Sequence, residues 1–173
     1  MRGFVVLAAS AILTACASSP ASTALPPSLA AIEAETGGRL GVSVIGADGK
    51  PLLGYRSDER FAMCSTFKTL LAALVLEGVQ QGSYTLDQKM TFTRADLVSY
   101  SPYVERRADV GEVSVGGAAG AAVSLSDNSA ANLLYGLVGG PGTLFQWLRT
   151  TGDTMTWPSR LEPELNENRP GDP

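Results

Sequence analysis

Apolar residues recur with two different periods along this chain, and the periods separate strands from helices. Val42 and Val44 alternate with other residues ahead of an Ala-Asp-Gly-Lys turn, which is typical of a β-hairpin. From Ser65 a long Leu- and Ala-rich stretch runs up to Gly82, which indicates a helix buried on most of its sides. In chain order the pattern predicts a helix over 28–36, strands over 40–45 and 52–55, the helix from Ser65, an extended segment over 86–93, and helices over 115–125, 129–137 and 141–152.

Helices dominate this prediction, so we expect an α+β fold with a largely helical lobe. The predicted hairpin has no later strand to extend its sheet, and two strands alone are marginally stable in water. Prolines recur after Trp157 and exclude regular structure from the tail. The antiparallel sheet is therefore expected to be incomplete within residues 28–173.

The first 27 residues are typical of an export signal and a linker. Residues 1–15 combine Arg2 with an apolar stretch shorter than the roughly 18 residues of a membrane-spanning helix, as in a signal peptide. Leu13-Thr14-Ala15-Cys16 resembles a bacterial lipobox, in which Cys16 becomes the lipidated first residue; ordinary cleavage near the same place is the alternative. Residues 16–27 are small, polar and proline-broken, like a linker. We expect a periplasmic protein, anchored to the outer membrane if Cys16 is lipidated.

Composition excludes several kinds of chemistry. The 173 residues are 45% apolar and 17% charged, too rich in core-forming side chains for a disordered chain, and they suit one domain with an extension. Thirteen basic and 17 acidic residues give a net charge of -4 without a Lys/Arg run, so we expect no nucleic-acid partner. The sequence has no histidine, which removes most zinc sites and His-based acid–base catalysis. We expect neither a metal nor a cofactor.

The start of the predicted long helix carries a candidate nucleophile. Ser65 and Lys68 are three positions apart and share one helix face, so the hydroxyl and the ammonium can meet. Free main-chain N–H groups and the positive end of the helix dipole favour negative charge at this end. The S-x-x-K spacing is weak evidence by itself, because Ser and Lys are common residues.

Two further motifs strengthen this hypothesis. Ser126-Asp127-Asn128 stands at a predicted helix break, where a helix cap is the simpler interpretation. Residues 160–166, Arg-Leu-Glu-Pro-Glu-Leu-Asn, lie in the tail, where a solvated loop is the simpler interpretation. In this order, S-x-x-K, S-D-N and E-P-E-L-N strongly resemble the class A serine β-lactamases. The blocks FAMCSTFK, Tyr100-Ser101-Pro102 and SLSDNSAANLL extend the resemblance from about Leu29 to the last residue.

The resemblance implies a serine β-lactamase/D,D-peptidase-like fold and a β-lactam as the small-molecule substrate of a monomer. Ser65 would attack the lactam carbonyl, and its N–H would form half of the oxyanion hole. The Ser65 proton would go to a neutral Lys68 or, through a water, to Glu162; both routes stay open. Ser126 would reprotonate the lactam nitrogen, and Glu162 would activate the water that hydrolyses the acyl-enzyme. Supporting roles would fall to Asn128 for the substrate amide, Asn166 for the water, Tyr100 for the entrance, Asp127 for the turn and Arg160 for the loop.

Glu162 separates the candidate functions. A base that activates water against the acyl-serine ester implies turnover, so a hydrolase that confers antibiotic resistance is preferred. A penicillin-binding or D,D-peptidase-like protein, which deacylates poorly, is one alternative. A non-catalytic envelope lipoprotein is the other.

The sequence also departs from the family. The K-T-G motif, which supplies the second oxyanion donor in the family, is absent. The usual Asp partner of Arg160 is missing too, and Asp172 does not match its position, so we expect an unpinned loop and an inactive fragment of a longer product. Cys64 resembles a cysteine that carbapenem-hydrolysing members bridge to one in the missing part; the alternative is an unbridged small residue packed behind Ser65.

Overall fold

The computed structural model describes residues 28–167, 169 and 171, which fall into two compact units divided between Glu59 and Arg60. The signal peptide, the linker and the lipidation of Cys16 are predicted for residues outside this part of the chain. Within it, no helix has both the length and the hydropathy needed to cross a membrane.

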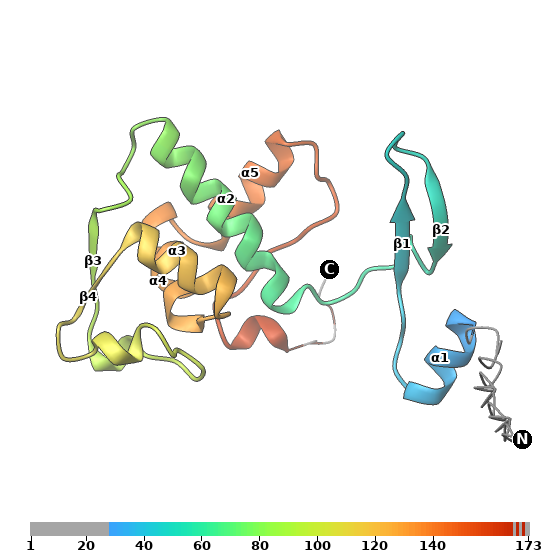
Figure 1. The fold of residues 1–173 in the computed structure, drawn as a ribbon, viewed down its shortest axis with the longest axis horizontal. Helices are drawn as coiled ribbons and strands as arrows, with labels where there is room; N and C mark the ends of the chain where they lie inside the picture. Colours follow the sequence, from blue (N-terminus) through green and yellow to red (C-terminus); the bar gives the residue numbers. More distant parts are fainter. Residues whose placement is uncertain (1–27, 168, 170, 172–173) are drawn as a thin grey trace, which may run out of the picture. The chain divides into compact units, whose positions relative to one another are not determined.

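The first unit joins a short helix to a hairpin. Helix α1 spans Leu29–Thr36; the Ser28 hydroxyl caps its start, and Gly37 ends it at a φ of 68°. Strand β1 (Val42–Ile45) pairs with β2 (Pro51–Tyr55) in an antiparallel two-stranded sheet. Figure 1 labels these elements. No residue between 28 and 59 is buried, so this unit has no apolar core of its own.

A carboxylate of α1 ties that helix to the hairpin. Glu33 accepts hydrogen bonds from Nε of Arg56 at 2.9 Å, from the Tyr55 hydroxyl at 2.7 Å and from the Leu40 N–H at 2.9 Å. The bonds from Arg56, Tyr55 and Leu40 lower the pKa of Glu33 to about 2. Because its hydroxyl donates to this carboxylate, the pKa of Tyr55 is raised.

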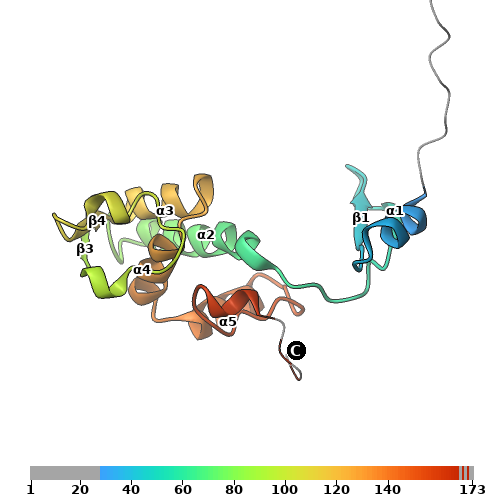
Figure 2. The ribbon, with the colours of Figure 1, turned by 90° about the horizontal axis from the view of Figure 1, so that it is seen from below.

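The second unit is a helical body. Its central helix α2 (Phe67–Gln80) packs against α3 (Val115–Ser124), α4 (Asn128–Val138) and α5 (Pro141–Thr150), as the two views in Figures 1 and 2 show. Strand β3 (Lys89–Thr91) pairs antiparallel with β4 (Glu112–Ser114). Fully buried apolar side chains hold the helices together: Leu71, Val75, Val104, Val115, Leu134 and Leu144.

The structure confirms the predicted α+β class and most of the predicted elements. The N-terminal helix, the hairpin and the helices over 115–125, 129–137 and 141–152 are present within a few residues of the predicted bounds. The long helix differs at its start, because Cys64–Thr66 form a 3-10 turn before α2 begins. Strand β4 was not predicted, since three residues are too few to show an alternating pattern.

Candidate active site

The predicted nucleophile lies where the 3-10 turn passes into α2. Ser65 is in the turn and Lys68 is in the first turn of the helix, and the Lys68 Nζ lies 3.3 Å from the Ser65 Oγ. Cys64 precedes them with a φ of 45°, in the left-handed region that a side chain with a Cβ rarely adopts. The interpretation of Cys64 as a residue packed behind Ser65 is wrong, because this turn leaves Cys64 exposed, with a free thiol among the described residues.

Lys68 is the centre of a buried polar cluster. Only 1% of its side chain is exposed. Its Nζ donates to the Ser126 carbonyl at 2.8 Å, to the Ser126 Oγ at 3.2 Å and to the Asn128 Oδ1 at 2.5 Å. It also pairs with the Glu162 Oε1 at 3.1 Å. A buried ammonium is stable only when such partners replace water, so this arrangement explains how a lysine lies inside the helical body.

Glu162 is buried and held through both its main chain and its carboxylate. The Asn132 amide forms a reciprocal pair with the Glu162 main chain: Nδ2 donates to the carbonyl, and the Glu162 N–H donates to Oδ1, both at 2.9 Å. The Asn166 Nδ2 donates to Glu162 Oε2 at 2.7 Å. One carboxylate oxygen therefore faces Asn166 and the other faces Lys68.

Asn132 is a site residue that the sequence analysis missed. It lies four positions after Asn128, so both amides are on one face of α4, and the Asn128 side chain meets Lys68 while the Asn132 side chain meets Glu162. Tyr135 continues this face and stacks on Phe67 with ring centroids 5.5 Å apart. Burial, together with the nearby Glu162 charge, raises the pKa of Tyr135. The helical spacing from Asn128 was the signal that could have identified Asn132.

The Ser126-Asp127-Asn128 turn is both a helix cap and part of the site. Asp127 is fully buried and caps α4 by accepting the Ala130 N–H at 2.8 Å, as the simpler interpretation predicts. Its other oxygen accepts the N–H groups of Tyr103 and Val104 at 2.7 and 3.1 Å. The cap therefore also fixes a neighbouring loop against the turn.

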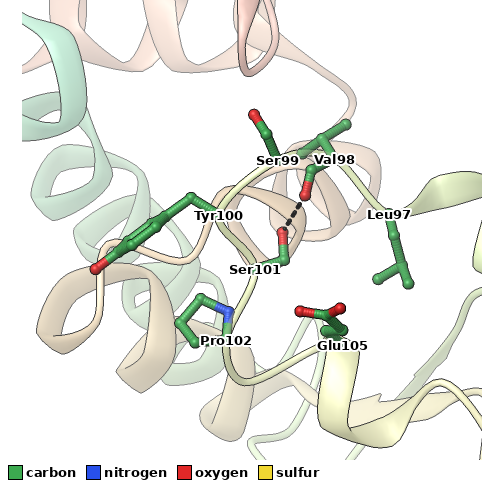
Figure 3. A pocket seen from close by; sticks show the side chains of 7 residues that line it. All are labelled: Leu97, Val98, Ser99, Tyr100, Ser101, Pro102 and Glu105. Carbon is green, nitrogen blue, oxygen red and sulfur yellow. Dashed lines mark hydrogen bonds between the residues drawn. The ribbon is translucent and has the colours of Figure 1, made fainter.

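Tyr100 lies at the surface, 69% exposed, with a φ of 60°. The Asn128 N–H donates to its carbonyl at 3.0 Å. Residues 97–102 and Glu105 line a pocket of about 320 Å³, drawn in Figure 3. Neither Ser65 nor Lys68 is among the residues that line it, so this pocket adjoins the Tyr100 loop and not the nucleophile.

The loop around Glu162 is anchored in a way that was not expected. The Arg160 guanidinium donates to the carbonyls of Glu164 and Glu167, each at 3.1 Å. These two bonds lie within the loop itself, whereas the Asn132 amide of α4 holds the Glu162 main chain and so attaches the loop to the helical body, contrary to the prediction of an unpinned loop. Asp172 lies outside the described part of the chain.

Comparisons with known proteins identify the family of this chain. The profile of the Beta-lactamase enzyme family matches residues 24–171. The chain belongs to this family.

Similarity to a curated relative and to solved structures places this chain in class A of the β-lactamases. The chain is 42% identical over 159 residues to Beta-lactamase L2 of Stenotrophomonas maltophilia. This aligned region covers 91% of this chain and 52% of the relative. An ancestral class A β-lactamase superposes with a TM-score of 0.78 at 51% identity, covering 83% of this chain and 55% of that chain. A β-lactamase from Burkholderia vietnamiensis superposes with a TM-score of 0.78 at 44% sequence identity; the match covers 81% of this chain and 52% of that chain. The predicted family is confirmed, and the chain spans about half the length of these relatives.

Proposed function

We propose that this chain carries the acylation and deacylation machinery of a class A serine β-lactamase, with Ser65 as the nucleophile. The observation that carries the proposal is the buried Lys68 amine, 3.3 Å from the Ser65 hydroxyl and 3.1 Å from the Glu162 carboxylate. A nucleophile within hydrogen-bond reach of a base that another group orients is the arrangement that acyl transfer requires.

In the acylation step, the Ser65 Oγ attacks the lactam carbonyl and the C–N bond of the ring breaks. The Ser65 proton passes to Lys68, if Lys68 has first given up a proton and is neutral, or, through a water, to Glu162; both routes stay open. The Lys68 Nζ also lies 3.2 Å from the Ser126 Oγ. Ser126 is therefore within reach to pass a proton from Lys68 to the departing ring nitrogen, which balances the proton taken from Ser65.

In the deacylation step, Glu162 removes a proton from a water, whose oxygen attacks the acyl-Ser65 ester; the bond between the carbonyl carbon and Ser65 Oγ then breaks, and the proton returns to Ser65 Oγ. Its carboxylate is oriented by Asn166 and Lys68, so an acceptor is fixed in place before substrate binds. Asn128 and Tyr100 are assigned to the substrate's acyl side chain, Asp127 to the turn and Arg160 to the loop. The reaction so proposed uses no metal or cofactor.

The proposal extends to the N-terminal residues, whose pattern is typical of an export signal and predicts a periplasmic protein. The proposal accordingly includes cleavage near residue 15, a linker up to residue 27 and a monomeric catalytic domain from residue 28. Cys16 is the proposed lipid attachment site, and ordinary cleavage remains its alternative.

Intact-mass measurement during incubation with a penicillin tests the proposed function. The proposal replaces the expectation of an inactive fragment: the parent chain is expected to gain the mass of one penicillin transiently, and Ser65→Ala is expected to gain none. A lasting adduct on the parent would favour the penicillin-binding or D,D-peptidase alternative. No adduct on the parent would contradict acyl transfer and favour a non-catalytic lipoprotein.

A further inference from the structure

We propose that Ser101 and Ser129 are positioning residues that together fix Tyr100 and Asn128, and so set how well the site accepts the acyl side chain of its substrate. This inference rests on the proposed function, because it concerns the two groups assigned to that side chain.

The two serines form a buried hydroxyl pair. Ser101 is 5% exposed and Ser129 is 1% exposed, and their Oγ atoms lie 2.6 Å apart. The Ser101 hydroxyl also donates a hydrogen bond to the Val98 carbonyl at 2.8 Å and accepts one from the Ser129 N–H at 3.0 Å. The Val98 N–H donates to the Ser129 Oγ at 2.9 Å. Each hydroxyl thus has several partners, as buried polar groups require, and such a satisfied network is rigid.

This pair stands next to the two groups that it is proposed to position. Ser101 follows Tyr100 and Ser129 follows Asn128 in the sequence. The Asn128 N–H donates to the Tyr100 carbonyl, and the Asn128 Nδ2 donates to the Ser99 carbonyl at 2.9 Å. Residues 98–101 are therefore held to the first turn of α4 by hydrogen bonds from both side chains and main chain.

The conformation of Tyr100 needs such support. Its φ of 60° is costly for a bulky residue and persists only where the surroundings enforce it. Figure 3 shows the Ser101 hydroxyl directed at the Val98 carbonyl, while the Tyr100 ring points to the opposite side from Leu97 and Glu105. The buried Ser101 anchor holds the chain directly after Tyr100, so the Cα–Cβ bond of Tyr100 keeps one direction.

Asn128 connects the loop to the catalytic lysine. Its Oδ1 accepts from Lys68 and its Nδ2 donates to Ser99. Displacement of the loop removes the second bond, so the Asn128 amide is then held by its bond from Lys68 and lies less firmly in place. The expected effect is weaker binding of the substrate's acyl side chain, while Ser65 and Lys68 keep their places at the start of α2.

Amide hydrogen exchange on the 173-residue chain tests the positioning directly. Ser129→Ala removes the acceptor of the Val98 N–H, so exchange at Val98 and Asn128 is expected to rise about tenfold. Ser129→Thr keeps the hydroxyl and is expected to restore protection; Ser101→Ala is expected to deprotect the Ser129 amide. Ser124→Ala is the control for loss of a hydroxyl, because among the described residues the Ser124 hydroxyl donates to the Gly120 carbonyl of its own helix and not to the Tyr100 loop. Unchanged exchange in both alanine variants would overturn the proposal.

Acylation by two penicillins tests the consequence for substrate. Benzylpenicillin carries an acyl side chain, and 6-aminopenicillanic acid carries none. Ser129→Ala is expected to weaken the apparent binding of benzylpenicillin on the order of tenfold, with its limiting acylation rate and all values for 6-aminopenicillanic acid unchanged. Equal losses with both compounds would overturn the specificity role. If the parent chain is acylated by neither, the proposed function fails, and the exchange result alone decides whether the pair positions the loop.

Discussion

At the scale of single residues, the site is marked by strained backbone. Cys64, Tyr100 and Ser126 have φ values of 45°, 60° and 56°, and all three are in or directly beside the S-x-x-K, Tyr100 and S-D-N segments. Such conformations gather where a surrounding structure holds functional groups in place. They are properties of the assembled fold, so the sequence motifs identify these residues without revealing their strain.

The buried pair of Lys68 and Glu162 leads to a prediction for stability. Lys68→Met leaves the Glu162 carboxylate buried without its cationic partner, which is expected to lower the free energy of unfolding by about 3–5 kcal/mol. The double variant Lys68→Met/Glu162→Leu removes both charges and is expected to recover most of this loss. Urea unfolding at pH 7, followed by the fluorescence of Trp147 and Trp157, measures both. A single variant that is as stable as the double variant would contradict a coupled buried pair.

At the scale of elements, the sequence predicted the regular helices and the hairpin but not the short 3-10 turn before α2 or the three-residue strand β4. Apolar periodicity and caps such as Ser28 and Gly37 are local signals, and they located α1 and the larger helices. The 3-10 turn at Cys64–Thr66 and strand β4 depend on contacts between distant segments. Asn132 was missed for the same reason, because its partner Glu162 is 30 positions away.

The first unit leads to a prediction about pH. The pKa of Glu33 falls from 4.5 to about 2 in the folded unit, so its bonds stabilise the unit fully above about pH 4.5 and are lost as the pH falls toward 2. The protection of the Leu40 amide, which donates to this carboxylate, is expected to decline over that range. Amide hydrogen exchange, corrected for the intrinsic pH dependence, measures it.

Two variants distinguish protonation of the Glu33 carboxylate from a general effect of acid on the fold. Glu33→Gln is expected to show low protection of Leu40 at every pH, whereas Glu35→Gln, on the same helix, is expected to behave like the parent. Protection of Leu40 that persists unchanged in Glu33→Gln would show that the carboxylate does not hold α1 to the hairpin.

At the scale of the whole molecule, the site is assembled from three segments far apart in sequence. Ser65 and Lys68 come from the start of α2, residues 126–128 from the start of α4, and Glu162 from the tail. All three belong to the unit that begins at Arg60. The chain spans about half the length of the relatives that it matches.

The most direct test of the account is the lifetime of the acyl-enzyme in Glu162→Gln. Gln keeps the size of Glu but does not accept a proton from water, so Ser65 is expected to be acylated and to stay acylated. Intact mass is followed over hours after addition of a penicillin to the parent and the variant. The account predicts an adduct that accumulates in Glu162→Gln and disappears from the parent as penicillin is consumed. Equal turnover in both proteins would contradict the assigned role of Glu162.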